Sequence, residues 1–240
     1  MKRDGLTLGW GVGACSWPGL RFSSAANVDL RADGTARIAC GTQDIGTGTY
    51  TILAQLVEEH TGIALDKIEV GLGDTALPVG PILGGSAATA SVIPAVSDAT
   101  RAAVKMLLSR AVHVDGSPFK GAKPEELAMS SGFVPRVDES AESGVPYVRI
   151  LEAANMSAAS GNASAKDDFD DPLKKKWSIH SYGAHFAEVT WKPETARLRV
   201  SRIVTVIDGG KILNPRAGRN QIEGAVVMGI GHGFVRAYDL

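Results

Sequence analysis

The chain has 240 residues, a formal net charge of −1 and 44% hydrophobic residues, which is typical of a globular protein with one large domain or two modest ones. Its 25 Lys and Arg against 26 Asp and Glu exclude a general nucleic-acid binder, because no basic excess can displace counterions from phosphates. No apolar run approaches the roughly 20 residues of a membrane span, and no apolar stretch follows the charged start as in a signal peptide, so we expect a cytoplasmic protein without a membrane partner.

The first 114 residues predict an α/β lobe that begins with strands. A Gly-punctuated strand is expected over 6–16, and strands over 25–30 and 35–40 flank the hairpin signal Asp33-Gly34. Cys15 and Cys40 form neither a metal-binding cluster nor a disulfide framework, and they are compatible with buried thiols.

A glycine-rich loop over 41–48, Gly-Thr-Gln-Asp-Ile-Gly-Thr-Gly, leads into a predicted helix that starts at Thr49 and ends near Gly62. Glycines before a helix let backbone approach a ligand, and the N–H groups of the helix start suit phosphate or another anion. The loop matches neither the phosphate loop nor the dinucleotide fingerprint, and it has no Lys. On these residues alone, a binding loop and an ordinary tight turn both stay open.

A second small-residue loop, over 84–91, follows a short predicted strand over 68–72. It precedes another predicted helix, whose expected buried stripe comprises Ala99, Ala102, Ala103, Met106 and Leu107. Twice, therefore, a strand leads through a small-residue loop to a helix.

From residue 115 to 177 the pattern gives way to Ser, Ala, Gly, Pro and charge, so we expect an irregular, exposed connector with one short strand over 147–150. Order returns over 178–240, where strands over 183–191 and 196–207 are joined by a turn and a final helix follows Asn214-Pro215. Gln221 lies at the rim of that helix's apolar stripe, where a surface role and a hydrogen bond to a ligand are both possible. The expected fold is α+β, with mixed sheets and packed helices.

Six motifs occur in the order seen in one family. They are the loop with its extension over 41–51, Gly-Asp-Thr over 73–75, Gly-Gly-Ser-x-x-Thr-Ala-Ser over 84–91, Tyr-Gly-Ala-His-Phe-Ala-Glu-Val over 182–189, Asp-Gly-Gly-Lys-Ile-Leu-Asn-Pro over 208–215 and Gln-Ile-Glu-Gly over 221–224. Together they resemble the molybdenum-cofactor-binding large subunit of the xanthine dehydrogenase and aldehyde oxidase family, particularly its bacterial aldehyde-oxidising members. The resemblance covers roughly residues 5–114 and 178–235.

The resemblance implies part of a molybdenum hydroxylase and of its two-part molybdopterin-binding region. Such an enzyme oxidises aldehydes or hydroxylates N-heterocycles using water. Its cofactor is molybdopterin, often in the cytosine dinucleotide form, and electrons leave through a [2Fe-2S] subunit and an FAD subunit. Some relatives reach the periplasm by co-export with a partner, which is the alternative to a cytoplasmic location.

Family roles are carried over by position. Ile45, Gly46 and Thr47 match the loop whose backbone approaches the pterin and molybdenum, although many relatives have Gln where Thr47 stands. Ala90 and Ser91 match the small residues beside the metal and the phosphate end of the cofactor, and Gln221 matches a Gln that hydrogen-bonds it. No direct metal ligand is expected, because cofactor sulfurs hold the molybdenum.

The family's catalytic Glu lies in a Gly-rich segment that would come after Leu240, so we expect no catalytic residue in this chain, which looks like an internal fragment of a longer subunit. Glu188 and Glu223 are interpreted as ordinary strand and helix residues. The alternative to an enzyme piece is a non-catalytic remnant that folds without cofactor. A third, weaker alternative is a sugar- or nucleotide-phosphate binder that uses the 41–48 loop alone.

Overall fold

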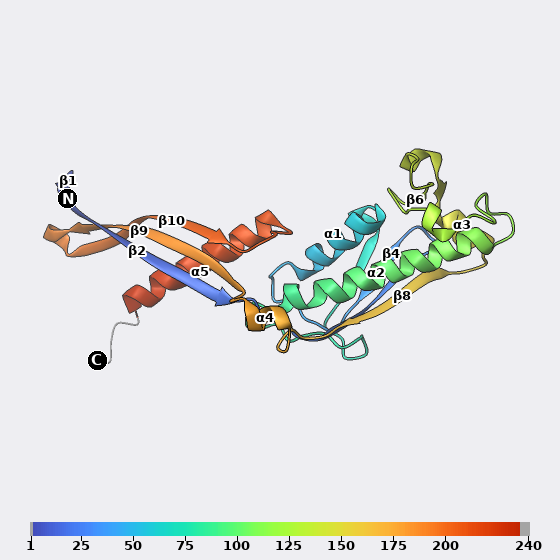
Figure 1. The fold of residues 1–240 in the computed structure, drawn as a ribbon. Helices are drawn as coiled ribbons and strands as arrows, with labels where there is room; N and C mark the ends of the chain where they lie inside the picture. The colour runs from blue at the N-terminus through green and yellow to red at the C-terminus, as the bar shows by residue number, and fades with distance from the viewer. Residues whose placement is uncertain (1, 236–240) are drawn as a thin grey trace. The chain divides into compact units, whose positions relative to one another are not determined.

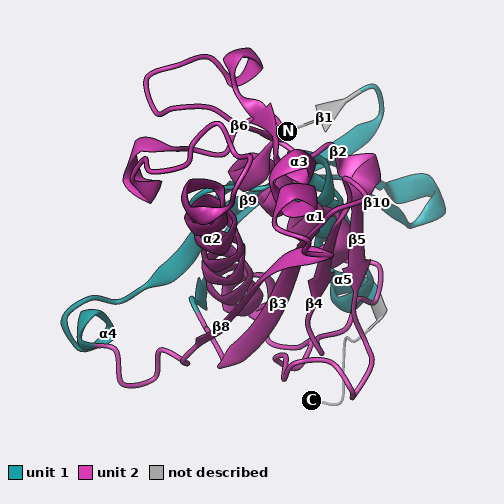
Figure 2. Cartoon of the chain, turned by 90° about the vertical axis from the view of Figure 1, so that its right-hand side faces the viewer, with its two compact units in different colours: residues 1–19, 172–240 teal, residues 20–171 magenta. Residues whose placement is uncertain are grey.

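The computed structural model describes residues 2–235, which form two compact units (Figure 2). Unit 1 comprises residues 1–19 and 172–240, of which 2–19 and 172–235 are described, and unit 2 comprises residues 20–171. This division differs from the expected segments of 1–114, 115–177 and 178–240. Strand pairing is the reason: β2 (Leu6–Pro18) pairs with β9 (His180–Lys192), and β3 (Ser24–Arg31) pairs with β8 (Ala158–Ala165).

Unit 2 is built on a four-stranded sheet of order β5-β4-β3-β8. The expected hairpin at Asp33-Gly34 is confirmed, since β3 and β4 (Ala36–Ala39) are antiparallel neighbours. β4 and β5 (Ile68–Gly71) are parallel, and the chain passes between them through α1 (Thr49–Thr61) and the short helix η1 (Leu65–Lys67). α1 ends at Gly62, as expected, because Gly62 has the left-handed φ of 67° that glycine tolerates.

The longest helix, α2 (Ala88–His113), packs along β3 and β8 and completes the core of unit 2 (Figure 1). Gly161 in β8 permits this approach, because a Cβ there would overlap the backbone of Ala99 and Ala103. The buried stripe of α2 includes Ala99, Ala103 and Leu107, but Met106 is 38% exposed, so that part of the prediction is wrong. The largest fully buried side chains include Leu30, Ile38, Leu53, Leu107, Ile150 and Leu151.

The segment expected to be an exposed connector is largely folded into unit 2. The predicted strand over 147–150 is wrong: it is the start of α3 (Tyr147–Ala153), which buries Tyr147, Ile150 and Leu151 at helical spacing. Short elements lead up to it, namely η2 (Pro124–Glu126), β6 (Phe133–Val134), η3 (Ala141–Ser143) and β7 (Val145–Pro146). β8 follows it and was missed because its small residues lack the alternation of a half-buried strand.

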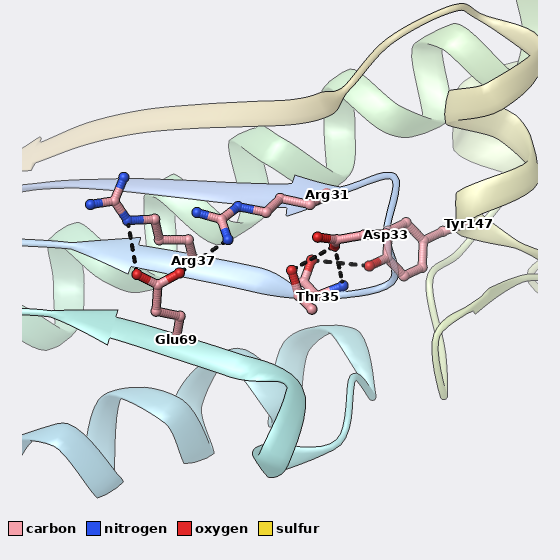
Figure 3. A network of polar contacts seen from close by, with 6 residues as sticks. All are labelled: Arg31, Asp33, Thr35, Arg37, Glu69 and Tyr147. Atoms are coloured by element: carbon pink, nitrogen blue, oxygen red, sulfur yellow. Dashed lines mark hydrogen bonds and ion pairs between the residues drawn. The ribbon is translucent and has the colours of Figure 1, made fainter.

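Polar contacts fasten α3 to the turn between β3 and β4 (Figure 3). The Asp33 carboxylate accepts the Thr35 N–H at 2.9 Å and the Thr35 hydroxyl at 2.6 Å, and the Tyr147 hydroxyl donates to the Thr35 carbonyl at 3.2 Å. Burial raises the pKa of Tyr147 to about 12, with a further contribution from the Asp33 charge. Tyr147 therefore stays neutral and acts as a structural hydrogen-bond donor.

Unit 1 is a four-stranded antiparallel sheet of order β1-β2-β9-β10, with β1 (Lys2–Arg3) and β10 (Arg197–Asp208) at its edges. Its other elements are α4 (Pro172–Lys176), η4 (Pro193–Thr195) between β9 and β10, and α5 (Pro215–Val235). β9, β10 and the final helix lie where they were expected. The mixed sheets with packed helices confirm the α+β class.

Unit 1 has no buried core comparable with that of unit 2. Within residues 4–19 and 172–234 no side chain is buried, whereas the core cluster lies wholly within unit 2. Large apolar side chains of unit 1 stand in solvent, with Val12 69%, Val227 67% and Met228 78% exposed. Exposed apolar side chains grouped on a sheet and helix are typical of interaction surfaces.

Candidate functional site

Two loops that precede helices pack against each other in unit 2, and we call residues 41–48 and 78–87 the paired loops. The Gly41 N–H donates to the Pro78 carbonyl at 2.6 Å, and the Thr42 hydroxyl donates to the Pro81 carbonyl at 2.9 Å. The Leu83 N–H donates to Oε1 of Gln43 at 3.2 Å. The first loop therefore holds the second in place by backbone and side-chain bonds.

Glycine makes this packing possible at two positions. A Cβ on Gly80 would overlap the backbone of Thr42, and a Cβ on Gly41 would lie 2.8 Å from the Pro78 carbonyl oxygen. These contacts are too short for any side chain, so the two glycines let the loops touch through bare backbone.

The helices that follow the paired loops, α1 and α2, begin at the same end of unit 2 (Figure 1). They run side by side, and Nε2 of His60 near the end of α1 lies 2.8 Å from the hydroxyl oxygen of Ser97 in α2. Two positive helix-dipole ends therefore meet at the paired loops, an arrangement that favours an anion.

Several backbone N–H groups of the first loop and of the start of α1 already donate hydrogen bonds to Asp44. Its Oδ1 accepts the N–H of Gly46 at 2.7 Å and that of Thr47 at 2.8 Å, and its Oδ2 accepts the N–H of Tyr50 at 3.3 Å. Partial burial raises the pKa of Asp44, but these backbone bonds outweigh it and bring the pKa below its usual value. The carboxylate thus occupies the position that an anionic ligand of this loop would take, which argues against the 41–48 loop as a phosphate site by itself.

The remaining surface of the first loop is open. Ile45 is 78% exposed, and Gly46 has φ of 97° with no atom within 4 Å of the place that a Cβ would take. The Thr47 hydroxyl stays within the loop, 3.3 Å from Oδ1 of Asp44 and 3.5 Å from the Thr49 hydroxyl. Ile45 and Gly46 are therefore accessible for van der Waals contact with a ligand, while the Thr47 side chain stabilises the loop.

The start of α2 differs from that of α1. Its N-cap residue is Ala87, whose side chain cannot accept a hydrogen bond from the first turn. The residues around that turn are small, and Gly85, Ser86 and Ala90 are exposed. The first N–H groups of a helix have no intrahelical partner, so this turn presents backbone donors beside small side chains.

The expected site residues lie in three places, namely the loop before α1, the first turn of α2, and α5. Ala90 is exposed on the first turn of α2, whereas Ser91 is fully buried: its hydroxyl donates to the Ala87 carbonyl at 2.7 Å and accepts the Phe22 N–H at 2.8 Å. The Ser91 side chain therefore ties α2 to the segment before β3. Gln221 lies in unit 1, on an exposed position of α5, whereas the other five lie in unit 2.

Glu188 and Glu223 are both engaged on the surface of unit 1. Glu188 accepts from Trp10 Nε1 at 3.1 Å and from the Ser201 hydroxyl at 2.8 Å, and Glu223 pairs with Arg219 at 2.7 Å within α5. Across residues 2–235, no group of three or more His, Cys, Asp or Glu side chains could hold a metal ion. The same residues contain no helix with the length and apolar character needed to cross a membrane.

Sequence reasoning missed Asp44 and Gln43, which organise the paired loops. A signal for Asp44 was present, since Asp followed by Ile-Gly-Thr before a helix is typical of a side chain that accepts backbone N–H groups two and three residues on. Gln43 carries no such local signal, because its partner Leu83 is 40 residues away.

Comparison with known proteins gives one consistent family. A model of the molybdopterin cofactor-binding domain matches residues 1–236. The aldehyde oxidoreductase molybdenum-binding subunit PaoC of Escherichia coli K12 is 32% identical over 231 residues, covering 95% of this chain and 29% of that subunit. The gamma subunit of the 6-hydroxypseudooxynicotine dehydrogenase complex of Paenarthrobacter nicotinovorans is 28% identical, covering 96% of this chain and 29% of that subunit.

Solved structures share the fold. Quinoline 2-oxidoreductase from Pseudomonas putida 86 superposes with a TM-score of 0.73 at 21% identity, covering 95% of this chain and 30% of that one. Reconstituted CO dehydrogenase from Oligotropha carboxidovorans superposes with a TM-score of 0.70 at 19% identity, covering 92% of this chain and 28% of that one. The chain thus spans less than a third of the length of these relatives.

Proposed function

The chain belongs to the molybdopterin cofactor-binding domain family, and on that premise we propose that it forms part of the molybdenum-binding subunit of an aldehyde oxidoreductase. The relatives it matches are molybdenum-binding subunits of oxidoreductases, which supports the family-level activity. The structural observation that carries the proposal is the first turn of α2, which follows the paired loops and whose N-cap residue Ala87 has no side-chain acceptor.

The residues at this place fit a molybdopterin. Such a cofactor is large, polar and anionic, and it needs backbone donors and small residues more than charged ligands. The first turn of α2 provides N–H donors, and the exposed Gly85, Ser86 and Ala90 leave room beside them. Gly46 adds an open backbone surface in the first of the paired loops.

In this assignment the backbone N–H groups of residues 88–90 bind the phosphate end of the cofactor. Gly46 lets the first loop lie close to the pterin, and Asp44 keeps that loop in one conformation by accepting its N–H groups. When bound, the cofactor supplies a molybdenum centre that oxidises the substrate with water as the source of oxygen. We propose the cytosine dinucleotide form of the cofactor and a side-chain hydrogen bond from Gln221 to it.

The substrate class and the partners follow from the relatives as proposals. Two relatives carry names of an aldehyde oxidoreductase and of a nicotine-derivative dehydrogenase complex, which supports a small aldehyde or an N-heterocycle as substrate. Both are named as subunits, which supports partner subunits for this chain. From the family resemblance we propose that these partners are a [2Fe-2S] subunit and an FAD subunit that take up the electrons. We propose a cytoplasmic location, with co-export to the periplasm as the alternative.

The catalytic base is assigned outside these 240 residues. The chain covers 29% of the matched PaoC subunit, and its two candidate carboxylates, Glu188 and Glu223, are each held in a surface pair. The open surfaces of unit 1 favour a second candidate for the chain by itself, a folded but non-catalytic part that requires the remaining length of the subunit.

The cofactor assignment is tested by the pterin and molybdenum content of the chain purified from a molybdopterin-producing host. Ala90→Trp places an indole at the start of α2, and we expect it to lower pterin content at least about fivefold by occupying the anion position. Ala153→Trp, at an exposed helical alanine of α3, is the matched control and should equal the wild type. Ala90 is preferable to Ser91 or Gly46, because Ser91 is buried and Gly46 has positive φ. Equal pterin content in all three proteins would contradict the assignment.

A further inference from the structure

Three chemically active side chains meet on one face of the unit 1 sheet, each from a different strand. Sγ of Cys15 in β2 lies 3.5 Å from Nε2 of His185 in β9. The other ring nitrogen of His185, Nδ1, lies 2.9 Å from Oγ1 of Thr205 in β10. The strand register explains why the three side chains are neighbours. His185 pairs directly with Thr205, and Cys15 pairs with the β9 residue two positions before His185.

Gly183 provides the space that the thiol needs. It is the residue directly paired with Cys15, and a Cβ at Gly183 would lie 3.0 Å from Sγ of Cys15. Without that Cβ the sulfur lies over β9 and reaches the imidazole of His185, which projects from the same face two residues on. The absence of a side chain at Gly183 therefore allows the Cys15 thiol to lie beside the His185 imidazole.

The two cysteines have opposite surroundings. Cys15 is exposed, which corrects the expectation that it is a buried thiol, whereas Cys40 is fully buried at the end of β4. Burial raises the pKa of the Cys40 thiol, and a buried neutral thiol is a poor nucleophile. Only Cys15 combines access to solvent with a base.

We propose that Cys15 is a modification site, at which His185 activates the thiol for exchange with low-molecular-weight disulfides and Thr205 positions the imidazole. The Cys15 proton passes to Nε2 of His185, and Sγ attacks one sulfur of the disulfide. A new Sγ–S bond forms and the disulfide's S–S bond breaks. The departing thiolate takes up the proton and leaves as a thiol, so Cys15 is oxidised and the second sulfur is reduced. This inference does not depend on the cofactor assignment.

The geometry suits the charged intermediate state of that exchange. When His185 holds the proton, both ring nitrogens are hydrogen-bond donors. Nε2–H then donates to the Cys15 thiolate and Nδ1–H donates to the Thr205 hydroxyl, so both donors have acceptors. A thiolate beside an imidazolium is the arrangement that makes cysteines reactive at neutral pH.

The test measures the rate at which the 240-residue chain reacts with dithiodipyridine, an uncharged aromatic disulfide, by absorbance of the released pyridinethione. Peptide mass spectrometry assigns the label to Cys15 or Cys40, and Cys15→Ser removes the fast phase. We expect His185→Gln to slow labelling of Cys15 by roughly tenfold, because glutamine keeps a polar side chain but cannot take a proton. Glutathione disulfide replaces the aromatic probe in a second series and should give the same order of rates.

Thr205 is tested as a positioning residue. Thr205→Val removes the hydroxyl with little change in shape and should slow labelling about threefold, and Thr205→Ser should restore the wild-type rate. Labelling in denaturant supplies the rate of an unstructured thiol, and circular dichroism checks that each variant is folded. Equal rates of Cys15 labelling in folded wild type and folded His185→Gln would overturn the proposal, as would a wild-type rate no higher than in denaturant.

Discussion

The carboxylate of Asp44 lies 2.8 Å from the backbone nitrogen of Thr47 and 3.3 Å from that of Tyr50, so a side chain of the first loop accepts one N–H group of the first turn of α1. The N-cap residue of α2 is Ala87, which has no side-chain acceptor. The two helix starts at the paired loops are therefore chemically different.

Asp44→Ala should lower the free energy of unfolding of unit 2 by about 1 kcal/mol, the usual cost of losing a side chain that accepts the first N–H groups of a helix. Denaturant unfolding of the purified chain measures the change. Asp98→Ala is the control, because Asp98 makes only an exposed pair with Arg101 within α2 and should cost less than about 0.5 kcal/mol. Equal effects of the two substitutions would show that Asp44 does not cap α1.

The Asp44 contribution should also depend on pH. Its pKa in the folded chain is below its ordinary value of 3.8, so its contribution to stability is complete above that range and is lost as the pH falls through the folded pKa. The stability difference between wild type and Asp44→Ala should therefore be constant near neutrality and shrink below about pH 4. If the stability difference instead grew as the pH fell, the lowered pKa of Asp44 would not explain it.

Gly161→Ala should destabilise unit 2 by about 1–3 kcal/mol, because its Cβ would overlap the backbone of α2 at Ala99 and Ala103. Gly11→Ala in β2 is the matched strand control, since no atom lies within 4 Å of its Cβ position. Thermal unfolding should separate the two variants clearly. A Gly161→Ala variant as stable as the wild type would mean that α2 does not approach β8 so closely.

How far the sequence predicts this molecule depends on whether each signal is local. The hairpin at Asp33-Gly34 and the end of α1 at Gly62 rest on backbone preferences of single residues, and both are confirmed. β8 rests on a tertiary contact: its Ala, Ser and Gly residues suit a strand only because α2 lies against Gly161. No pattern within the strand itself could have revealed that.

The same distinction holds for the candidate site. The loop containing Ile45 and Gly46 and the helix start containing Ala90 could be located from small-residue runs before helices. The burial of Ser91 could not, because it follows from hydrogen bonds to Ala87 and Phe22 that only the fold creates. The exposure of Cys15 likewise follows from the open sheet of unit 1 rather than from its neighbours in sequence.

The exposed apolar side chains of unit 1 should make the isolated chain self-associate and bind a hydrophobic dye. Val12→Thr together with Met228→Glu should reduce both effects without lowering the free energy of unfolding, because Val12 is 69% and Met228 is 78% exposed. Val28→Thr, at a fully buried position, should instead destabilise unit 2. A monomeric, dye-free wild-type chain would show that these surfaces need no cover.

The final prediction is that the 240-residue chain alone does not turn over substrate, even when mature cofactor is supplied. Oxidation with water requires a positioned base, which commonly contributes of order 10²–10⁴-fold to the rate. The two candidate carboxylates of this chain already have partners. Glu188 accepts from Trp10 and Ser201, and Glu223 pairs with Arg219. The chain also covers only 29% of the matched PaoC subunit, and we expect the base to come from the remaining length of such a subunit. The assay is aldehyde oxidation with an artificial electron acceptor, run beside elemental analysis for molybdenum. Turnover above background would show that a residue of this chain acts as the base. The first variant to test would then be Glu223→Gln, which keeps the shape of the side chain but removes its charge.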